Sequence, residues 1–292
     1  MKWYLALWVF CLTPVYAQNR PPTTEGLAEL AELVLGKNGG DRLFYYPTRT
    51  APYDPKRYGI EFEDVTFKSG DGLRLHGWFM SPARGVKPKG AIVFSHGNAG
   101  SVGHHIGFTA WMVRAGYQVF LYDYRGYGKS EGEITRKGML EDVRAAITYV
   151  ATRKDVDRNR VISFGHSLGG AQSLAALGEK KMEGLRAVVS FAGFASYKDM
   201  ARRFAGDAGA DLVTDDLSAR DLISKIAPVP VLIVHGTADG TVPIGQGEIL
   251  FAKAGQPKAF FKVKGGSHTG ALAMNNGEYR KRILDWLDEV VK

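Results

Sequence analysis

The chain has 292 residues, of which 45% are hydrophobic and 11% aromatic, and its formal net charge at pH 7 is +8. This much apolar material can form one continuous core, which excludes a largely disordered chain. Lys and Arg are scattered along the sequence, and no nucleic-acid-binding motif, zinc-type spacing of Cys and His, or internal repeat is present. We therefore expect a globular protein that binds neither nucleic acid nor a metal ion.

The first residues, MKWYLALWVFCLTPVYAQ, resemble a secretory signal peptide. One lysine precedes an uncharged apolar run, and Val15 and Ala17 supply the β-branched and small side chains expected at positions −3 and −1 of a cleavage site. We predict that residues 1–17 are a signal peptide and that the remaining chain is exported to the periplasm or the medium. Cleavage removes Cys11, the only cysteine. The alternative is an uncleaved N-terminal membrane anchor, although Pro14 interrupts its apolar run.

Residues 18–59 are predicted to form an N-terminal arm, with one short amphipathic helix in LAELAELVLG. In residues 57–82, apolar and polar side chains alternate on both sides of a Ser-Gly-Asp-Gly turn, which is the pattern of a β-hairpin. We expect the main domain to begin at this hairpin and to span residues 60–292.

From residue 91 onward, short apolar runs alternate with segments of helical periodicity. Continuous apolar runs are typical of strands that are buried on both faces of a sheet. The predicted strands are 91–95, 117–124, 161–164, 187–194, 229–236 and 259–265, and the predicted helices are 102–116, 136–154, 168–181 and 278–292. This order predicts an α/β fold with a mostly parallel central sheet, an antiparallel leading edge and helices on both faces.

Residues 195–227 do not follow the alternation, because they are small, polar and acidic without a strong apolar face. They follow a predicted strand and would form an insertion over the carboxyl edge of the sheet. We expect a small cap or lid here. The alternative is an ordinary helical connection that shapes no pocket.

The sequence Gly-His-Ser-Leu-Gly directly follows strand 161–164 and precedes a helix of small residues. A tight turn from strand to helix exposes its central side chain and needs small residues two positions before and after it, as Gly165 and Gly169 provide. The helix that follows directs the positive end of its dipole at the same point. We predict that Ser167 is a nucleophile rather than only a polar turn residue.

A serine hydroxyl needs a base that takes its proton. His268 is the best candidate, because it lies in Gly-Gly-Ser-His just after the last predicted strand. An acid must orient the imidazole and stabilise its charged form. Asp239, in the loop HGTADGTVP after a buried strand, fits this role, and Asp199 is the alternative.

The oxyanion of an acyl-transfer intermediate needs two backbone N–H donors. One is expected from Leu168, at the start of the helix after the nucleophile. The second is expected from Asn98, in the narrow loop HGNAGS that follows strand 91–95.

Five of the six remaining histidines are expected to have structural roles, or at most to contact substrate. His166 precedes Ser167, but a tight turn directs successive side chains apart. The other four are His76, His96, His104 and His105.

With the motifs SHGNAGS, DYRGYGKSEG, GHSLGG, HGTADGTVP and GGSH in this order, the chain resembles the α/β-hydrolase superfamily over roughly residues 60–292. Within it, the preamble LFYYPTR…EDVTF…DGLRLHGWF is similar to that of the near-capless ABHD-type group and its bacterial esterase-like relatives. The resemblance implies an α/β-hydrolase fold. By motif, Ser167, Asp239 and His268 match the catalytic triad, Asn98 and Leu168 match the oxyanion donors, and residues 123–128 match a loop that braces the nucleophile turn.

The resemblance also implies a serine hydrolase that cleaves carboxylic esters or thioesters through an acyl-enzyme, with no cofactor, and the predicted signal peptide makes it an exported one. Its partner would be a small-molecule ester or acyl substrate, and its basic surface leaves contact with a membrane surface open. A serine peptidase or amidase would use the same residues. A non-catalytic binding scaffold is the alternative from another class, although loss of activity normally replaces a triad residue and none is replaced here.

Overall fold

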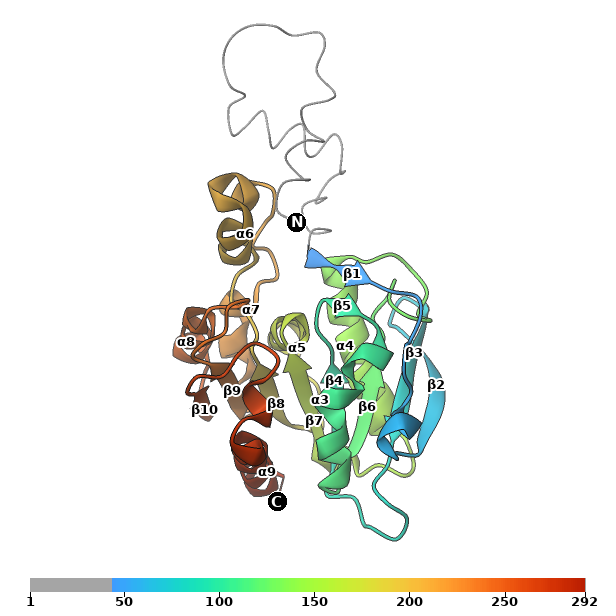
Figure 1. Ribbon diagram of the computed structural model, residues 1–292. Helices are drawn as coiled ribbons and strands as arrows, with labels where there is room; N and C mark the ends of the chain where they lie inside the picture. Colours follow the sequence, from blue (N-terminus) through green and yellow to red (C-terminus); the bar gives the residue numbers. More distant parts are fainter. Residues whose placement is uncertain (1–43, 292) are drawn as a thin grey trace, which may run out of the picture.

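The computed structural model describes residues 44–291 (Figure 1). The predicted signal peptide and the predicted helix of the arm lie outside these residues. The strands of the described part are β1 (Tyr46–Pro47), β2 (Phe62–Lys68), β3 (Arg74–Met80), β4 (Ala91–Ser95), β5 (Ala99–Gly100), β6 (Gln118–Tyr122), β7 (Val161–His166), β8 (Leu185–Phe191), β9 (Val231–Gly236) and β10 (Lys258–Val263).

In the described part of the chain, eight of these strands form one sheet in the order β10-β9-β8-β7-β4-β6-β3-β2. The β2–β3 and β3–β6 pairs are antiparallel, and the other pairs are parallel. This confirms the predicted mostly parallel sheet with an antiparallel leading edge. A separate parallel pair, β1 with β5, joins the arm to the loop after β4, which the sequence did not predict.

The helices cover both faces of the sheet, as predicted (Figure 1). They are α3 (Val102–Arg114), α4 (Arg136–Thr152), α5 (Leu168–Glu179), α6 (Tyr197–Asp211), α7 (Ala219–Leu222), α8 (Ile244–Lys253) and α9 (Glu278–Val290). Alternate residues of β4 explain the two layers, since side chains of a strand point to opposite faces in turn. Val93 lies in the core cluster that includes α4 and α5, and Ile92 lies in the cluster that includes α3 and α9. The sequence did not predict α8.

The segment 195–227 divides into two parts. Helix α6 stands beyond the carboxyl ends of the strands (Figure 1), and its backbone is kinked at Ala205 and Gly206. Tyr197 and Met200 of α6 are buried in the core cluster of α5, as are apolar side chains of α7 and the 3-10 turn Ile223–Ile226. Within this segment, α6 is the part that stands at the position predicted for a cap.

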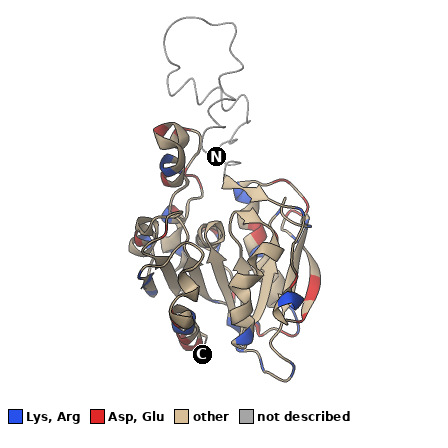
Figure 2. Ribbon diagram, in the orientation of Figure 1, with Lys and Arg blue, Asp and Glu red and all other residues tan. Residues whose placement is uncertain are grey.

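Charged residues lie on the outer helices and the edge of the sheet, while its interior strands are nearly free of them (Figure 2). Strands β4, β6, β7 and β9 contain no Lys, Arg, Asp or Glu. This is the pattern expected of strands that helices cover on both faces. Within residues 44–291, no helix has the length and hydropathy needed to cross a bilayer.

Candidate active site

Ser167 occupies a strained turn between β7 and α5. Its backbone has φ 55° and ψ −119°, a conformation that L-residues rarely adopt. The turn is too tight for side chains at its flanks, because a Cβ atom on Gly165 would lie 2.3 Å from the carbonyl oxygen of Gly169, and one on Gly169 would lie 2.0 Å from that of Ser95. The glycines that the motif requires therefore allow the main chain to bring Ser167 to the carboxyl edge of the sheet.

The structure brings together three of the predicted site residues in one hydrogen-bonded chain. The Nε2 atom of His268 lies 3.0 Å from the Oγ atom of Ser167, and its Nδ1 atom lies 2.7 Å from the Oδ2 atom of Asp239. Since a carboxylate only accepts hydrogen bonds, Nδ1 carries the proton of a neutral ring and Nε2 is left as the acceptor for the serine hydroxyl. This is the tautomer that a general base needs.

Asp239 carries a negative charge next to the imidazole of His268. Burial opposes its charge, but hydrogen bonds from His235, His268 and the N–H of Val242 hold the pKa of Asp239 below its usual range. Its Oδ1 atom accepts the N–H groups of Thr241 at 2.9 Å and Val242 at 2.8 Å. An ionised, fixed carboxylate can orient the imidazole and stabilise its protonated form.

His235 is a neighbour of Asp239 that sequence reasoning missed. It is fully buried at the end of β9, where its Nε2 atom lies 2.8 Å from the carbonyl oxygen of Val242 and 3.5 Å from the Oδ2 atom of Asp239. It therefore ties the turn that follows Asp239 to the strand that precedes it. Its place in His-Gly-x-x-Asp was the only signal in the sequence.

Asp199, the alternative acid, lies in α6 and takes no part in this chain. Its carboxylate accepts the side-chain amide of Gln246 at 3.3 Å and lies 3.7 Å from the guanidinium of Arg202. The structure thus joins Asp239, and not Asp199, to His268.

The two predicted oxyanion donors belong to segments that lie next to Ser167. The N–H of Leu168 belongs to the first turn of α5, where it has no partner within the helix. The loop of Asn98 passes next to the nucleophile, since a Cβ atom on Gly97 would lie only 3.8 Å from that of Ser167. Among the hydrogen bonds of residues 44–291, neither N–H has an acceptor, so both are free to bind an oxyanion.

The loop 123–128 supports the loop after β4, which contains Asn98, rather than the turn at Ser167. The hydroxyl of Tyr124 donates to the carbonyl oxygen of His96 at 3.0 Å, and that of Tyr127 donates to the carbonyl oxygen of Asn98 at 2.8 Å. The buried Asp123 accepts the N–H of Val102 at the start of α3. These contacts fix the position of the loop after β4 before any substrate binds.

His166 contacts the main chain of His268, with its Nε2 atom 3.3 Å from the carbonyl oxygen of that residue. His105 has a structural contact, since its Nε2 atom lies 2.8 Å from the carbonyl oxygen of Ala99. The pattern of the sequence identified neither partner.

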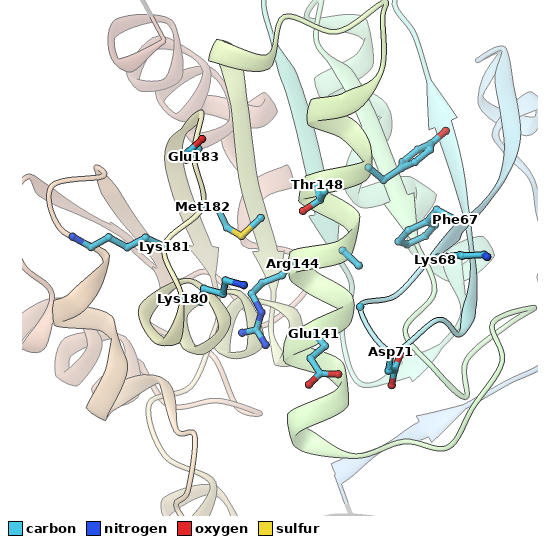
Figure 3. Close-up of a pocket in the computed structure, with 13 residues that line it drawn as sticks. Phe67, Lys68, Asp71, Glu141, Arg144, Thr148, Lys180, Lys181, Met182 and Glu183 are labelled. Atoms are coloured by element: carbon cyan, nitrogen blue, oxygen red, sulfur yellow. The ribbon is translucent and has the colours of Figure 1, made fainter.

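A cavity of about 810 Å³ lies elsewhere on the molecule, between α4, the hairpin turn and the loop after α5 (Figure 3). Two of the charged side chains that line it form ion pairs, Arg144 with Glu179 at 2.8 Å and Asp71 with Arg125 at 2.9 Å. None of the predicted site residues lines it. Among residues 44–291, no group of three His, Cys, Asp or Glu side chains is placed to hold a metal ion.

Comparisons with known proteins identify the family to which the chain is similar. The family model described as serine aminopeptidase, S33 matches residues 86–214. The chain is 36% identical over 250 residues to the uncharacterized protein YfhR of Escherichia coli K12, covering 84% of this chain and 86% of that protein. It is 30% identical over 275 residues to the α/β hydrolase domain-containing protein WAV2 of Arabidopsis thaliana, covering 85% and 87%.

Among solved structures, the Pyrococcus furiosus esterase Pf2001 matches with a TM-score of 0.72 and 17% identity, over 85% of this chain and 99% of that one. This likeness shows the same fold. The similarity to WAV2, over 85% of this chain, shows that the chain belongs to the α/β-hydrolase family.

Proposed function

We propose that the protein is a serine hydrolase that cleaves carboxylic esters or thioesters through an acyl-enzyme on Ser167. The observation that carries the proposal is the continuous chain from Ser167 through His268 to Asp239, set beside two free backbone N–H groups. Nucleophile, base, orienting acid and oxyanion donors are the parts that acyl transfer requires.

In the first half-reaction, Nε2 of His268 takes the hydroxyl proton as Oγ of Ser167 attacks the substrate carbonyl carbon. The carbonyl oxygen becomes an anion that the N–H groups of Asn98 and Leu168 stabilise. The intermediate then expels the alcohol or thiol, which receives the proton from His268. This leaves the acyl group on Ser167.

In the second half-reaction, His268 takes a proton from water, and the resulting hydroxide attacks the acyl carbon. Collapse of this intermediate releases the carboxylic acid and returns the proton to Ser167. Asp239 remains an anion throughout and stabilises the imidazolium formed at each attack.

Amide or peptide hydrolysis is the second candidate, because the matching family model is described as a serine aminopeptidase. An amine is a poorer leaving group than an alcohol or thiol, so amide cleavage depends more strongly on proton delivery by His268. An ester, a thioester and an amide with the same acyl group distinguish the candidates by their values of kcat/KM. We expect the ester and the thioester to react fastest.

Export remains part of the proposal and rests on residues 1–17 alone. Their charge, apolar run and small residue at the cleavage position support removal of this segment during secretion.

The experiment that tests the proposal is intact-mass analysis after reaction with a fluorophosphonate. We expect one adduct per wild-type chain and none on Ser167→Ala, because only an activated serine attacks the reagent. A folded wild-type chain that stays unlabelled would overturn the proposal in favour of a binding scaffold.

A further inference from the structure

His166 is clamped in one orientation immediately before the proposed nucleophile. It is the last residue of β7, and only 3% of it is exposed. Its ring stacks on Phe108 of α3, with centroids 4.3 Å apart, and on Phe191 of β8, with centroids 5.0 Å apart. Because two aromatic rings pack against the imidazole of His166, this imidazole has little freedom to rotate.

This orientation directs one ring nitrogen at the main chain of the proposed base. The Nε2 atom lies 3.3 Å from the carbonyl oxygen of His268, and the two rings have centroids 5.1 Å apart. A carbonyl oxygen only accepts hydrogen bonds, so Nε2 of His166 carries the proton. Its Nδ1 atom is buried and has no hydrogen-bond partner among the described residues, as fits the unprotonated nitrogen of a neutral ring.

A neutral His166 suits its place beside a base that becomes positively charged. Burial lowers the pKa of His166 well below the usual value, and the nearby His268 lowers it further. His166 therefore adds no positive charge next to His268, and its contribution to the site is a directed N–H group.

His268 needs such an anchor because its loop is largely exposed. Lys264, Gly265, Ser267 and Thr269 are all exposed, and no helix or strand includes His268. Asp239 holds the imidazole of His268 through the Nδ1 atom, but the position of the Cα atom of His268 depends on the main chain of this loop. A misplacement of about 1 Å between base and nucleophile can reduce the rate by about 100-fold.

We propose that His166 is a positioning residue, whose Nε2–H group holds the main chain of His268 so that the imidazole stays within reach of Ser167. This inference rests on the proposed hydrolase function. It predicts a loss of rate at each active site, and not merely a loss of folded protein.

The test measures rapid acylation of Ser167 by an activated ester, in which the burst amplitude counts competent sites and the burst rate reports acylation at each of them. His166→Phe keeps an aromatic ring between Phe108 and Phe191 but removes the donor. We expect a full burst with a rate about 10-fold lower and an unchanged KM. His166→Gln places an amide N–H near the position of Nε2, and we expect it to recover most of the rate.

Tyr117→Phe is the matched control, because it removes a part-buried hydrogen bond of a buried aromatic side chain, from the hydroxyl to Asp288, at the opposite edge of the sheet. Its burst rate should equal that of the wild type. If His166→Phe does not fold, His166→Asn replaces it, since its shorter amide does not reach the carbonyl oxygen of His268.

The outcomes distinguish a failure of the proposed hydrolase function from a failure of the positioning role of His166. A folded wild-type chain that neither hydrolyses the activated ester nor reacts with a fluorophosphonate overturns the proposed hydrolase function. A wild-type burst with a smaller amplitude but an unchanged rate in His166→Phe or His166→Asn assigns His166 a structural role only and overturns the positioning role. Equal rates for the Phe and Gln variants, both below the wild type, also overturn it, because the donor would then not matter.

Discussion

The Nε2 atom of His268 lies 3.0 Å from the Oγ atom of Ser167, although 101 positions separate the two residues in the chain. The sheet topology explains this proximity. Ser167 follows β7 and His268 follows β10, and strands β7 to β10 are parallel neighbours in the sheet. Loops that follow parallel strands meet at one edge, which is where α/β proteins place their reactive groups.

The acid assignment predicts different effects for two aspartates. Asp239→Asn keeps the shape of the side chain but removes the charge that stabilises the imidazolium and selects the Nδ1–H tautomer. We expect kcat to fall by about 10³- to 10⁴-fold. Asp199→Asn serves as the control and should retain activity within about threefold, since Asp199 contacts Gln246 and Arg202 instead of His268. The reverse pattern in steady-state ester hydrolysis would contradict the assignment.

The tight turn at Ser167 predicts that Gly169 tolerates no side chain. In Gly169→Ala, the new Cβ atom would lie 2.0 Å from the carbonyl oxygen of Ser95, so β4 and α5 must separate. We expect a loss of several kcal/mol in the free energy of unfolding, measured by urea denaturation. Gly245→Ala, also in a helix but with no atom within 4 Å of the new Cβ, should be neutral or stabilising. Equal stability of both variants would show that the contact is not tight.

The overall fold and the hydrogen-bonded chain at Ser167 were predictable because their signals are local. Buried parallel strands appear as short apolar runs, and each candidate residue follows such a run directly. Once the strands are parallel neighbours, their carboxyl ends meet without any further information. Ser167, Asp239 and His268 thus assemble from three short segments of sequence.

Other features could not be predicted, because they depend on contacts between segments that are distant in the sequence. The contacts of His166 and His235 join side chains to carbonyl oxygens of distant loops. The pairing of β1 with β5 involves two residues in each strand, which is too short for a periodic pattern. No sequence pattern divides 195–227, since its second half is buried by contacts with α5 and α8, which lie elsewhere in the chain.

Buried histidines predict that stability falls in mild acid. Burial lowers the pKa of His105 to about 4, whereas an unfolded histidine titrates near 6.5. Between these values the unfolded chain binds a proton that the native chain does not, so the free energy of unfolding falls as the pH decreases through this window. Each such histidine contributes up to about 1.4 kcal/mol per pH unit.

Urea denaturation between pH 4 and pH 8 tests this dependence. His105→Gln should have a shallower decline than the wild type, because one titrating group is gone. Thr109→Val, a buried and non-titrating change in the same helix, should lower stability equally at every pH. If the free energy of unfolding of His105→Gln falls with decreasing pH as steeply as that of the wild type, the prediction is wrong.

The proposed signal peptide predicts the N-terminus of the mature protein. When the full chain is expressed in a secreting host, N-terminal sequencing of the exported protein should begin at Gln18. Ala17→Arg places a long charged side chain at position −1 and should block cleavage while leaving residues 44–291 unchanged. Recovery of wild-type Met1 in the membrane fraction would instead indicate the uncleaved anchor.

Helix α6 predicts a preference for apolar acyl groups if it acts as the cap of the site. It joins the loop of Asp239 through a hydrogen bond from Arg203 to the carbonyl oxygen of Gly240, and its Phe204 is 64% exposed. An exposed phenylalanine can bury apolar surface against a long acyl chain, so Phe204→Ser should raise KM for long-chain esters by roughly tenfold and leave short esters unchanged.

The control for this prediction is Val86→Ser, which removes another exposed apolar side chain, 49% exposed, in the loop before β4 and therefore at the amino edge of the sheet. Because both side chains are largely exposed, neither change should alter the free energy of unfolding by more than about 0.5 kcal/mol. The measurement is KM across a series of esters that differ only in acyl length. If Phe204→Ser changes KM equally for short and long esters, or not at all, α6 does not contact the acyl chain and is an ordinary helical connection.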